Sequence, residues 1–229
     1  MPIGKAEILA VLADPLLARM NFAVGDIMIN AQQYKNVAAY IADGDIGVVS
    51  GRGALAFYDG NRNEIETQAG NPPLNLADRA QILHECTHAI ADVNALDVLR
   101  LTDEVAAYLA QLTYMHISQP GPLPTGPRGP ARPMGRLTMG VNAVIRKYEL
   151  HQPKGFGVSI SDLDIWNLAN DVRRHPEYTT VKHTDKSTRD PRNLGVPVKN
   201  NQMRALKAAL KGRPPRARTY TPSPRLEIF

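Results

Sequence analysis

The segment His84-Glu85-Cys86-Thr87-His88 constrains this chain of 229 residues more than any other stretch. Residues four apart on an α-helix lie on one face, about 6 Å apart along the axis, so the two histidines can point at one metal ion. The flanking pairs Ile82-Leu83 and Ala89-Ile90 are apolar, which indicates a buried helix. The segment therefore predicts a helix that carries part of a metal site.

Glu85 adjoins the first histidine and can reach a water on the metal without being a ligand itself. Two imidazole ligands with a neighbouring glutamate as general base are the arrangement of a zinc hydrolase. The competing interpretation is a buried helix with two incidental histidines. Cys86 is turned away from the metal face by the helical geometry, and we interpret it as a small packing residue.

A catalytic zinc site needs a third protein ligand. No histidine follows at the short spacing of an H-E-x-x-H-x-x-G-x-x-H pattern, because the chain continues with Ala91, Val93 and Asn94. Glu104 fits better, since it opens the next predicted helix, which can return antiparallel over the two imidazoles. Its neighbour Asp103 is the rival ligand, and a helix turns about 100° per residue, so both cannot face the metal.

With Glu104 included, the chain resembles the gluzincin branch of the zincin metallopeptidases, whose pattern is H-E-x-x-H followed on the next helix by E-x-x-A or a close variant. The resemblance covers residues 82–114 and is specific at four positions. It implies a zinc ion held by His84, His88 and Glu104, with Glu85 as the general base. Asp103 remains open as the alternative third ligand.

Periodicity and turn signals predict an α+β fold that is mainly helical, with a small antiparallel β-meander before the helix that carries the two histidines. The resemblance implies that this core is zincin-like. The predicted helices are 5–22 with a break at Pro15, 26–42, 76–95, 103–117, 137–150, 161–174 and a short basic helix at 200–211. The expected N-caps of four of them are Asp26, Asn75, Thr102 and Ser161. The predicted strands are 46–50, 54–58 and 64–67, the last two joined by Asp59-Gly60-Asn61.

Composition divides the chain into four regions: a core with N-terminal helices at 1–118, a Pro/Gly-rich linker or surface loop at 119–135, a C-terminal helical region at 136–211, and a basic, disordered tail at 212–229. The resemblance implies that the first region is a zincin-like metallopeptidase core. Charge divides unevenly along the chain. Residues 1–172 hold 13 Lys/Arg against 18 Asp/Glu, whereas residues 173–229 hold 14 against 4. The tail therefore predicts contact with an acidic partner or a nucleic acid.

The N-terminus carries no secretory signal pattern, because Asp14 and Pro15 interrupt its apolar run. No apolar stretch approaches the roughly 20 residues of a membrane span. The single cysteine excludes an internal disulfide. We expect a soluble cytoplasmic protein, with export as an effector by a route without a signal peptide as the alternative. No feature of the sequence indicates an oligomeric state.

These observations favour a zinc-dependent metallopeptidase, a hydrolase acting on a peptide or protein. The alternatives are an inactive zincin-like protein, an effector or toxin, and a nucleic-acid or acidic-partner binder that acts through residues 212–229. A peptidase also needs a donor to the tetrahedral oxyanion. The candidates for this donor are Tyr58, Tyr114, His116, His151, His175 and His183.

Overall fold

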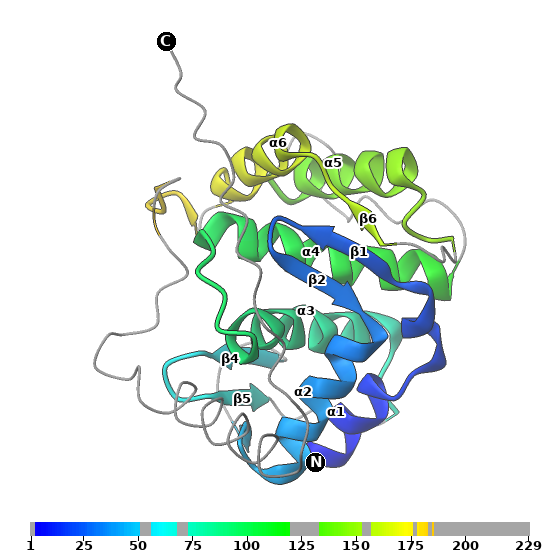
Figure 1. Ribbon diagram of the computed structural model, residues 1–229, viewed down its shortest axis with the longest axis vertical. Coiled ribbons are helices and arrows are strands. Elements are labelled where there is room, and N and C mark those ends of the chain that lie inside the picture. The colour runs from blue at the N-terminus through cyan, green and yellow to red at the C-terminus, as the bar shows by residue number, and fades with distance from the viewer. Residues whose placement is uncertain are drawn as a thin grey trace, which may run out of the picture.

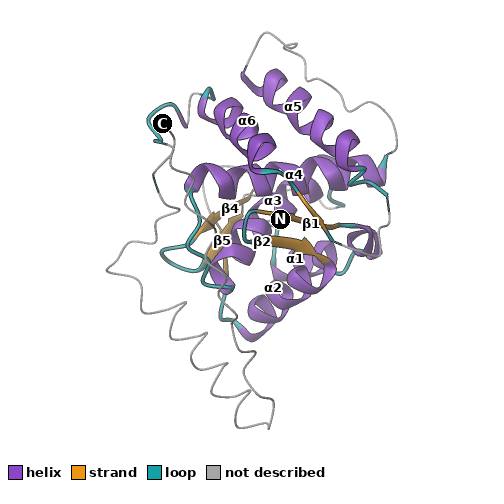
Figure 2. Ribbon diagram, turned by 45° about the horizontal axis from the view of Figure 1, so that its top comes forward, coloured by secondary structure: helices purple, strands orange, loops and turns teal. Residues whose placement is uncertain are grey.

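A computed structural model describes residues 3–50, 56–67, 73–119, 133–152, 157–175, 178–182 and 185. Within these residues the fold is α+β and mainly helical, as predicted, with two small three-stranded sheets (Figures 1 and 2). In chain order the elements are α1 (Lys5–Leu12), η1 (Pro15–Arg19), β1 (Asn21–Val24), β2 (Ile27–Asn30), α2 (Ala31–Asp43), β3 (Gly47–Ser50), β4 (Ala56–Asp59), β5 (Glu64–Thr67), α3 (Leu76–Val93), α4 (Arg100–Ser118), α5 (Pro133–Tyr148), β6 (Val158–Ser159) and α6 (Asp162–Arg173).

The helix predicted at 26–42 begins later than expected. Asn30 caps α2 with its side chain, which accepts the N–H of Gln33, and Gly44 ends the helix at a φ of 79°. Asp26 is not a cap. It lies beside Gly25, whose φ is 56°, in the two-residue connection between β1 and β2. The expectation of a helix here was wrong because a glycine with positive φ favours a tight hairpin turn.

The second sheet lies directly before the metal-binding helix, as predicted, but its pairing differs from a simple meander. β4 and β5 form the expected antiparallel hairpin, whereas β3 pairs in parallel with β5, giving the order β3-β5-β4. β4 is therefore an edge strand of this sheet. It packs against α3 (Figure 1).

α3 and α4 form the centre of the molecule and pack against each other (Figure 1). Asn75 caps α3 as predicted: its side chain accepts the N–H of Asp78, and the Asp78 carboxylate accepts the N–H of Asn75. The apolar face of α3 is buried, and Cys86 is fully buried within it. The predicted cap Thr102 is wrong, because α4 begins at Arg100 after Leu99.

The C-terminal helices cover α4. α6 packs on α4 and α5, and the short strand β6 pairs in parallel with β1. Ser161 caps α6 as predicted, its hydroxyl accepting the N–H of Asp164. Residues 120–132 of the Pro/Gly-rich segment predicted at 119–135, the predicted helix 200–211 and the basic tail 212–229 lie outside the described residues. The last three residues of that segment belong to α5, which begins at Pro133, earlier than predicted. No helix in the described part of the chain is both long and apolar enough to cross a membrane.

Candidate metal centre

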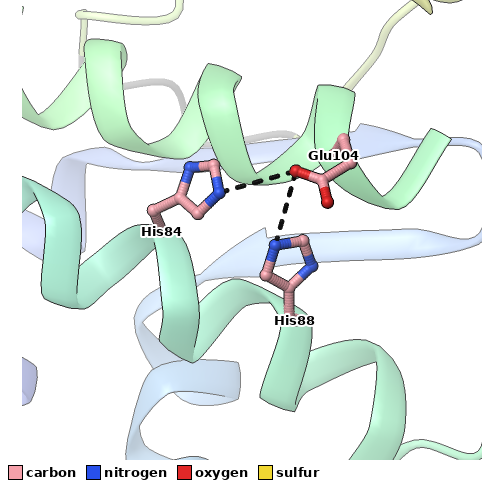
Figure 3. Close-up of side chains that lie close together, drawn as sticks. All are labelled: His84, His88 and Glu104. Carbon is pink, nitrogen blue, oxygen red and sulfur yellow. Dashed lines mark ion pairs between the residues drawn. The ribbon is translucent and has the colours of Figure 1, made fainter. Parts of the chain in front are cut away.

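The two histidines of α3 and Glu104 of α4 point at one another (Figure 3). Oε2 of Glu104 lies 3.7 Å from Nε2 of His84 and 3.7 Å from Nε2 of His88. One ligand atom from each residue lies within 4.8 Å of the others. These three residues therefore form a group that could hold a metal ion.

The geometry and burial of the group fit a divalent cation. Tetrahedral zinc with ligands at about 2.0–2.1 Å places neighbouring ligand atoms about 3.4 Å apart, close to the two distances of 3.7 Å. Oε2 of Glu104 is buried, and no hydrogen bond reaches it from the described residues. An unsatisfied buried carboxylate oxygen is costly, and a cation between the three atoms would satisfy it.

Asp103 lies behind His88 and not among the three ligands. Its Oδ2 accepts a hydrogen bond from Nδ1 of His88 at 2.9 Å, and its side chain is 8% exposed. This contact leaves Nε2 of His88 free to face Glu104. Carboxylates in this position orient a ligating imidazole and raise its basicity. Of the two acidic residues that the sequence left open, Glu104 is therefore the one that joins the histidines.

The charges of the group compensate one another. Burial alone would lower the pKa of His88, but the carboxylates of Asp103 and Glu104 raise it to about 10. Burial would likewise raise the pKa of Glu104, but His88, His84 and a hydrogen bond from Tyr178 lower it to about 2. The metal-free group thus holds the Glu104 carboxylate ionised beside a cationic His88 imidazole. A bound cation would supply the same positive charge.

Glu85 is 5% exposed and lies in the same pocket as the three ligands. Its Oε2 accepts the main-chain N–H of Tyr58 on β4 at 3.0 Å, and its Oε1 accepts Nε2 of Gln81 at 2.7 Å. Strand β4 therefore holds the carboxylate from one side and α3 from the other. The carboxylate needs no rearrangement to face the pocket.

The pocket has a volume of about 420 Å³ and lies between β4, α3 and the start of α4. Phe57 on β4 lines it and is 53% exposed, so an apolar ring faces solvent at its border. Tyr178, from the segment after α6, also lines the pocket and donates a hydrogen bond to Glu104. The guanidinium of Arg100 lies 6.0 Å from the centre of the Tyr178 ring.

The predicted donors to an oxyanion fall mostly elsewhere. Of those that the structure describes, only Tyr58 lines the pocket, and its hydroxyl donates to Asp92 at 2.5 Å. Tyr114 donates to Asp14 instead, and His116 pairs with Asn142. His151 and His175 lie outside the pocket lining, and His183 lies outside the described residues.

Three residues of the site escaped the sequence interpretation in whole or in part. Gln81 precedes the motif by one helical turn, and Gln111 lies seven residues after Glu104 on α4. Tyr178 lies about seventy residues beyond Glu104, in a segment with no motif. The helical spacing of Gln81 to Glu85 was a usable signal, since residues four apart share a face.

Comparison of the chain with models of known protein families, with curated proteins and with solved structures finds no match. The functional interpretation therefore depends on the chemistry of the site itself.

Proposed function

We propose that this chain is a zinc-dependent peptidase, in which His84, His88 and Glu104 hold the metal and Glu85 is the general base. The observation that carries the proposal is the position of Glu85. Its buried carboxylate lies in the pocket that the three ligand residues line, and two N–H groups hold it there. A metal group with an adjacent fixed carboxylate suits hydrolysis better than simple metal storage.

Zinc bound at such a site supplies Lewis acidity, which activates water and polarises a carbonyl group. The Glu85 carboxylate takes a proton from the attacking water and later gives it to the leaving amine nitrogen. Asp103 keeps the His88 ring oriented through its 2.9 Å contact with Nδ1. Tyr58 supplies a main-chain N–H that keeps Glu85 turned into the pocket.

An extended peptide is the substrate that suits this pocket. β4 is an edge strand, and Phe57 to Asn61 border the pocket, so a substrate chain can lie along the strand beside the site. The exposed ring of Phe57 offers an apolar contact to a substrate side chain.

The test combines metal analysis with one substitution. We expect purified protein to contain about one zinc per chain and to cleave members of a mixed peptide library. Glu85→Gln should keep the zinc and lower kcat by at least about 100-fold, as expected for loss of a general base. Glu66→Gln is the matched control, because Glu66 is a half-buried carboxylate on β5 whose ion pair is with Arg62.

Three outcomes would count against the proposal. Purified protein that binds no zinc would contradict the proposed metal site. Full activity in Glu85→Gln would contradict the role of Glu85 as general base. A zinc-loaded chain that cleaves no peptide of the library favours the inactive zincin-like alternative.

A further inference from the structure

A chain of side-chain hydrogen bonds connects the metal ligand His84 to the carboxylate of Glu85. Nδ1 of His84 lies 3.2 Å from Oε1 of Gln111 on α4. Nε2 of Gln111 donates to Oε1 of Gln81 on α3 at 3.2 Å. Nε2 of Gln81 then donates to Oε1 of Glu85 at 2.7 Å. Two amides thus join the two groups that the proposed reaction uses.

The direction of the bonds follows from which amide atom faces which partner. Nε2 of Gln81 faces Glu85 and Nε2 of Gln111 faces Gln81, and an amide nitrogen only donates hydrogen bonds. The oxygen of Gln81 then faces Gln111, which must donate in turn and present its own oxygen to His84. Nδ1 of His84 therefore carries the hydrogen, and the lone pair of Nε2 faces Glu104.

The contacts also explain why the two helices keep this arrangement. Glu104 meets His84 and His88, while Gln111, two turns later on α4, meets Gln81 and His84. As the residue number increases along α4, the number of its contact partner on α3 decreases, so the two helices run antiparallel. The two amides therefore span the interface between α3 and α4 and connect His84 to Glu85 through hydrogen bonds.

We propose that Gln81 and Gln111 are positioning residues that form an amide relay. The relay, defined as the Gln81–Gln111 pair, selects the tautomer of His84 that can bind metal and at the same time orients Glu85. The part concerning Glu85 rests on the proposed peptidase function. The part concerning His84 concerns metal affinity alone and stands without it.

Three variants separate the two ends of the relay. Gln111→Glu keeps an acceptor for Nδ1 of His84 but cannot donate to Gln81, whose amide must turn and present its oxygen to Glu85. We expect a zinc Kd equal to that of the wild type or tighter, with kcat about tenfold lower. Gln111→Met removes the acceptor as well, so zinc binding should weaken about tenfold and kcat should also fall.

Gln81→Met removes the donor to Glu85 and the acceptor of the Gln111 amide, but it leaves the Gln111 oxygen available to Nδ1 of His84. It should leave the zinc Kd and KM within about twofold of the wild type and lower kcat about tenfold. Asn142→Leu is the matched control for all three variants. Asn142 forms a similar histidine–amide contact at 2.9 Å, with His116 on the same helix α4, away from the pocket. Its loss should leave zinc affinity and kcat unchanged.

Two readouts are needed: the zinc Kd by competition with a chromophoric chelator, and the ¹⁵N–¹H signal of the His84 Nδ1–H in the zinc-loaded protein. The signal should persist in Gln111→Glu and exchange at least tenfold faster in Gln111→Met. Equal weakening of zinc binding in both Gln111 variants would overturn the tautomer role. Unchanged kcat in Gln81→Met, with an active wild type, would overturn the role toward Glu85.

Failure of the proposed function gives a different result. A wild type that binds zinc and hydrolyses nothing refutes the peptidase assignment, while the order of zinc affinities among the Gln111 variants still tests the relay. Circular dichroism identifies any variant that does not fold. Gln111→Glu, which keeps the size and polarity of the side chain, leaves the relay testable if Gln111→Met fails.

Discussion

Amide substitution of Asp103 and of Glu104, one at a time, separates a metal ligand from the residue that orients one. Glu104→Gln keeps the shape but replaces the ligating carboxylate with an amide, a poor zinc ligand. Zinc sites with four ligands bind with about 10–16 kcal/mol, so one ligand contributes about 2.5–4 kcal/mol. The zinc Kd of Glu104→Gln should therefore rise about 60- to 700-fold, at about 1.4 kcal/mol per factor of ten.

Asp103→Asn should have a much smaller effect. In the wild type Nδ1 of His88 lies 2.9 Å from the Asp103 carboxylate. The amide oxygen of the variant can still accept this hydrogen bond, but the bond is no longer charge-assisted. Charged and neutral hydrogen bonds differ by about 1–1.5 kcal/mol, and the site is too buried for water to compensate. Zinc binding should therefore weaken about tenfold.

The zinc Kd of each variant is measured by chelator competition at pH 7.5, and circular dichroism establishes that each variant is folded. Asp171→Asn is the control, because Asp171 forms an exposed ion pair with Arg174 on α6. If Asp103→Asn lost several hundred-fold in affinity and Glu104→Gln only tenfold, the ligand roles would be reversed. The arrangement in Figure 3 would then be wrong.

Two further predictions concern groups outside the metal ligands. Hydrogen bonds from Lys147, Ser161 and Tyr148 lower the pKa of Asp164 to about 2, so this carboxylate stabilises the fold above about pH 4 and the contribution is lost as pH falls toward 2. Asp164→Asn should lower the unfolding free energy by about 1 kcal/mol at pH 7 and progressively less below pH 4 in urea titrations; an equal loss at pH 3 would contradict this. Burial, with the nearby Glu85 charge, raises the pKa of the Cys86 thiol. An aromatic disulfide reagent at pH 8 should therefore label Cys86 only after denaturant is added. Rapid labelling of the native chain would show that the thiol is not buried.

The candidate metal group could be predicted from sequence because its signals are local. The spacing of His84 and His88 defines one face of a helix, and Asn75 fixes where that helix begins. Glu104 follows after one short loop. The sequence favoured Glu104 but left Asp103 open as the alternative, because the choice depends on how α4 is rotated against α3, which tertiary packing decides.

The hairpin of β1 and β2 was missed although a signal was present. Gly25 and Asp26 separate two short runs in which Phe22, Val24, Ile27 and Ile29 are buried. The same aspartate also suits a helix N-cap, and the apolar spacing after it fits both periods loosely. Sheet formation with β6, about 130 residues later, supports the strand, and no local window contains that partner.

The parallel pairing of β3 with β5 was beyond local reasoning for a similar reason. Each strand was recognised by its own composition, but the partner of β3 depends on the path of residues that lie between the strands. Tyr178 illustrates the same limit at the site. Its residue type and its neighbours carry no signal, and only the packing of α6 on α4 explains why it can reach Glu104.

The distance along the chain between Glu104 and Tyr178 has a consequence for biosynthesis. The three ligands lie within 21 consecutive residues, His84 to Glu104, whereas Tyr178 follows about seventy residues later. At about 5–20 residues per second, a ribosome needs about 4–15 seconds to make that interval. A growing chain thus contains all three residues of the candidate metal group several seconds before Tyr178 is added, so this group and the pocket lining are completed at different times during synthesis.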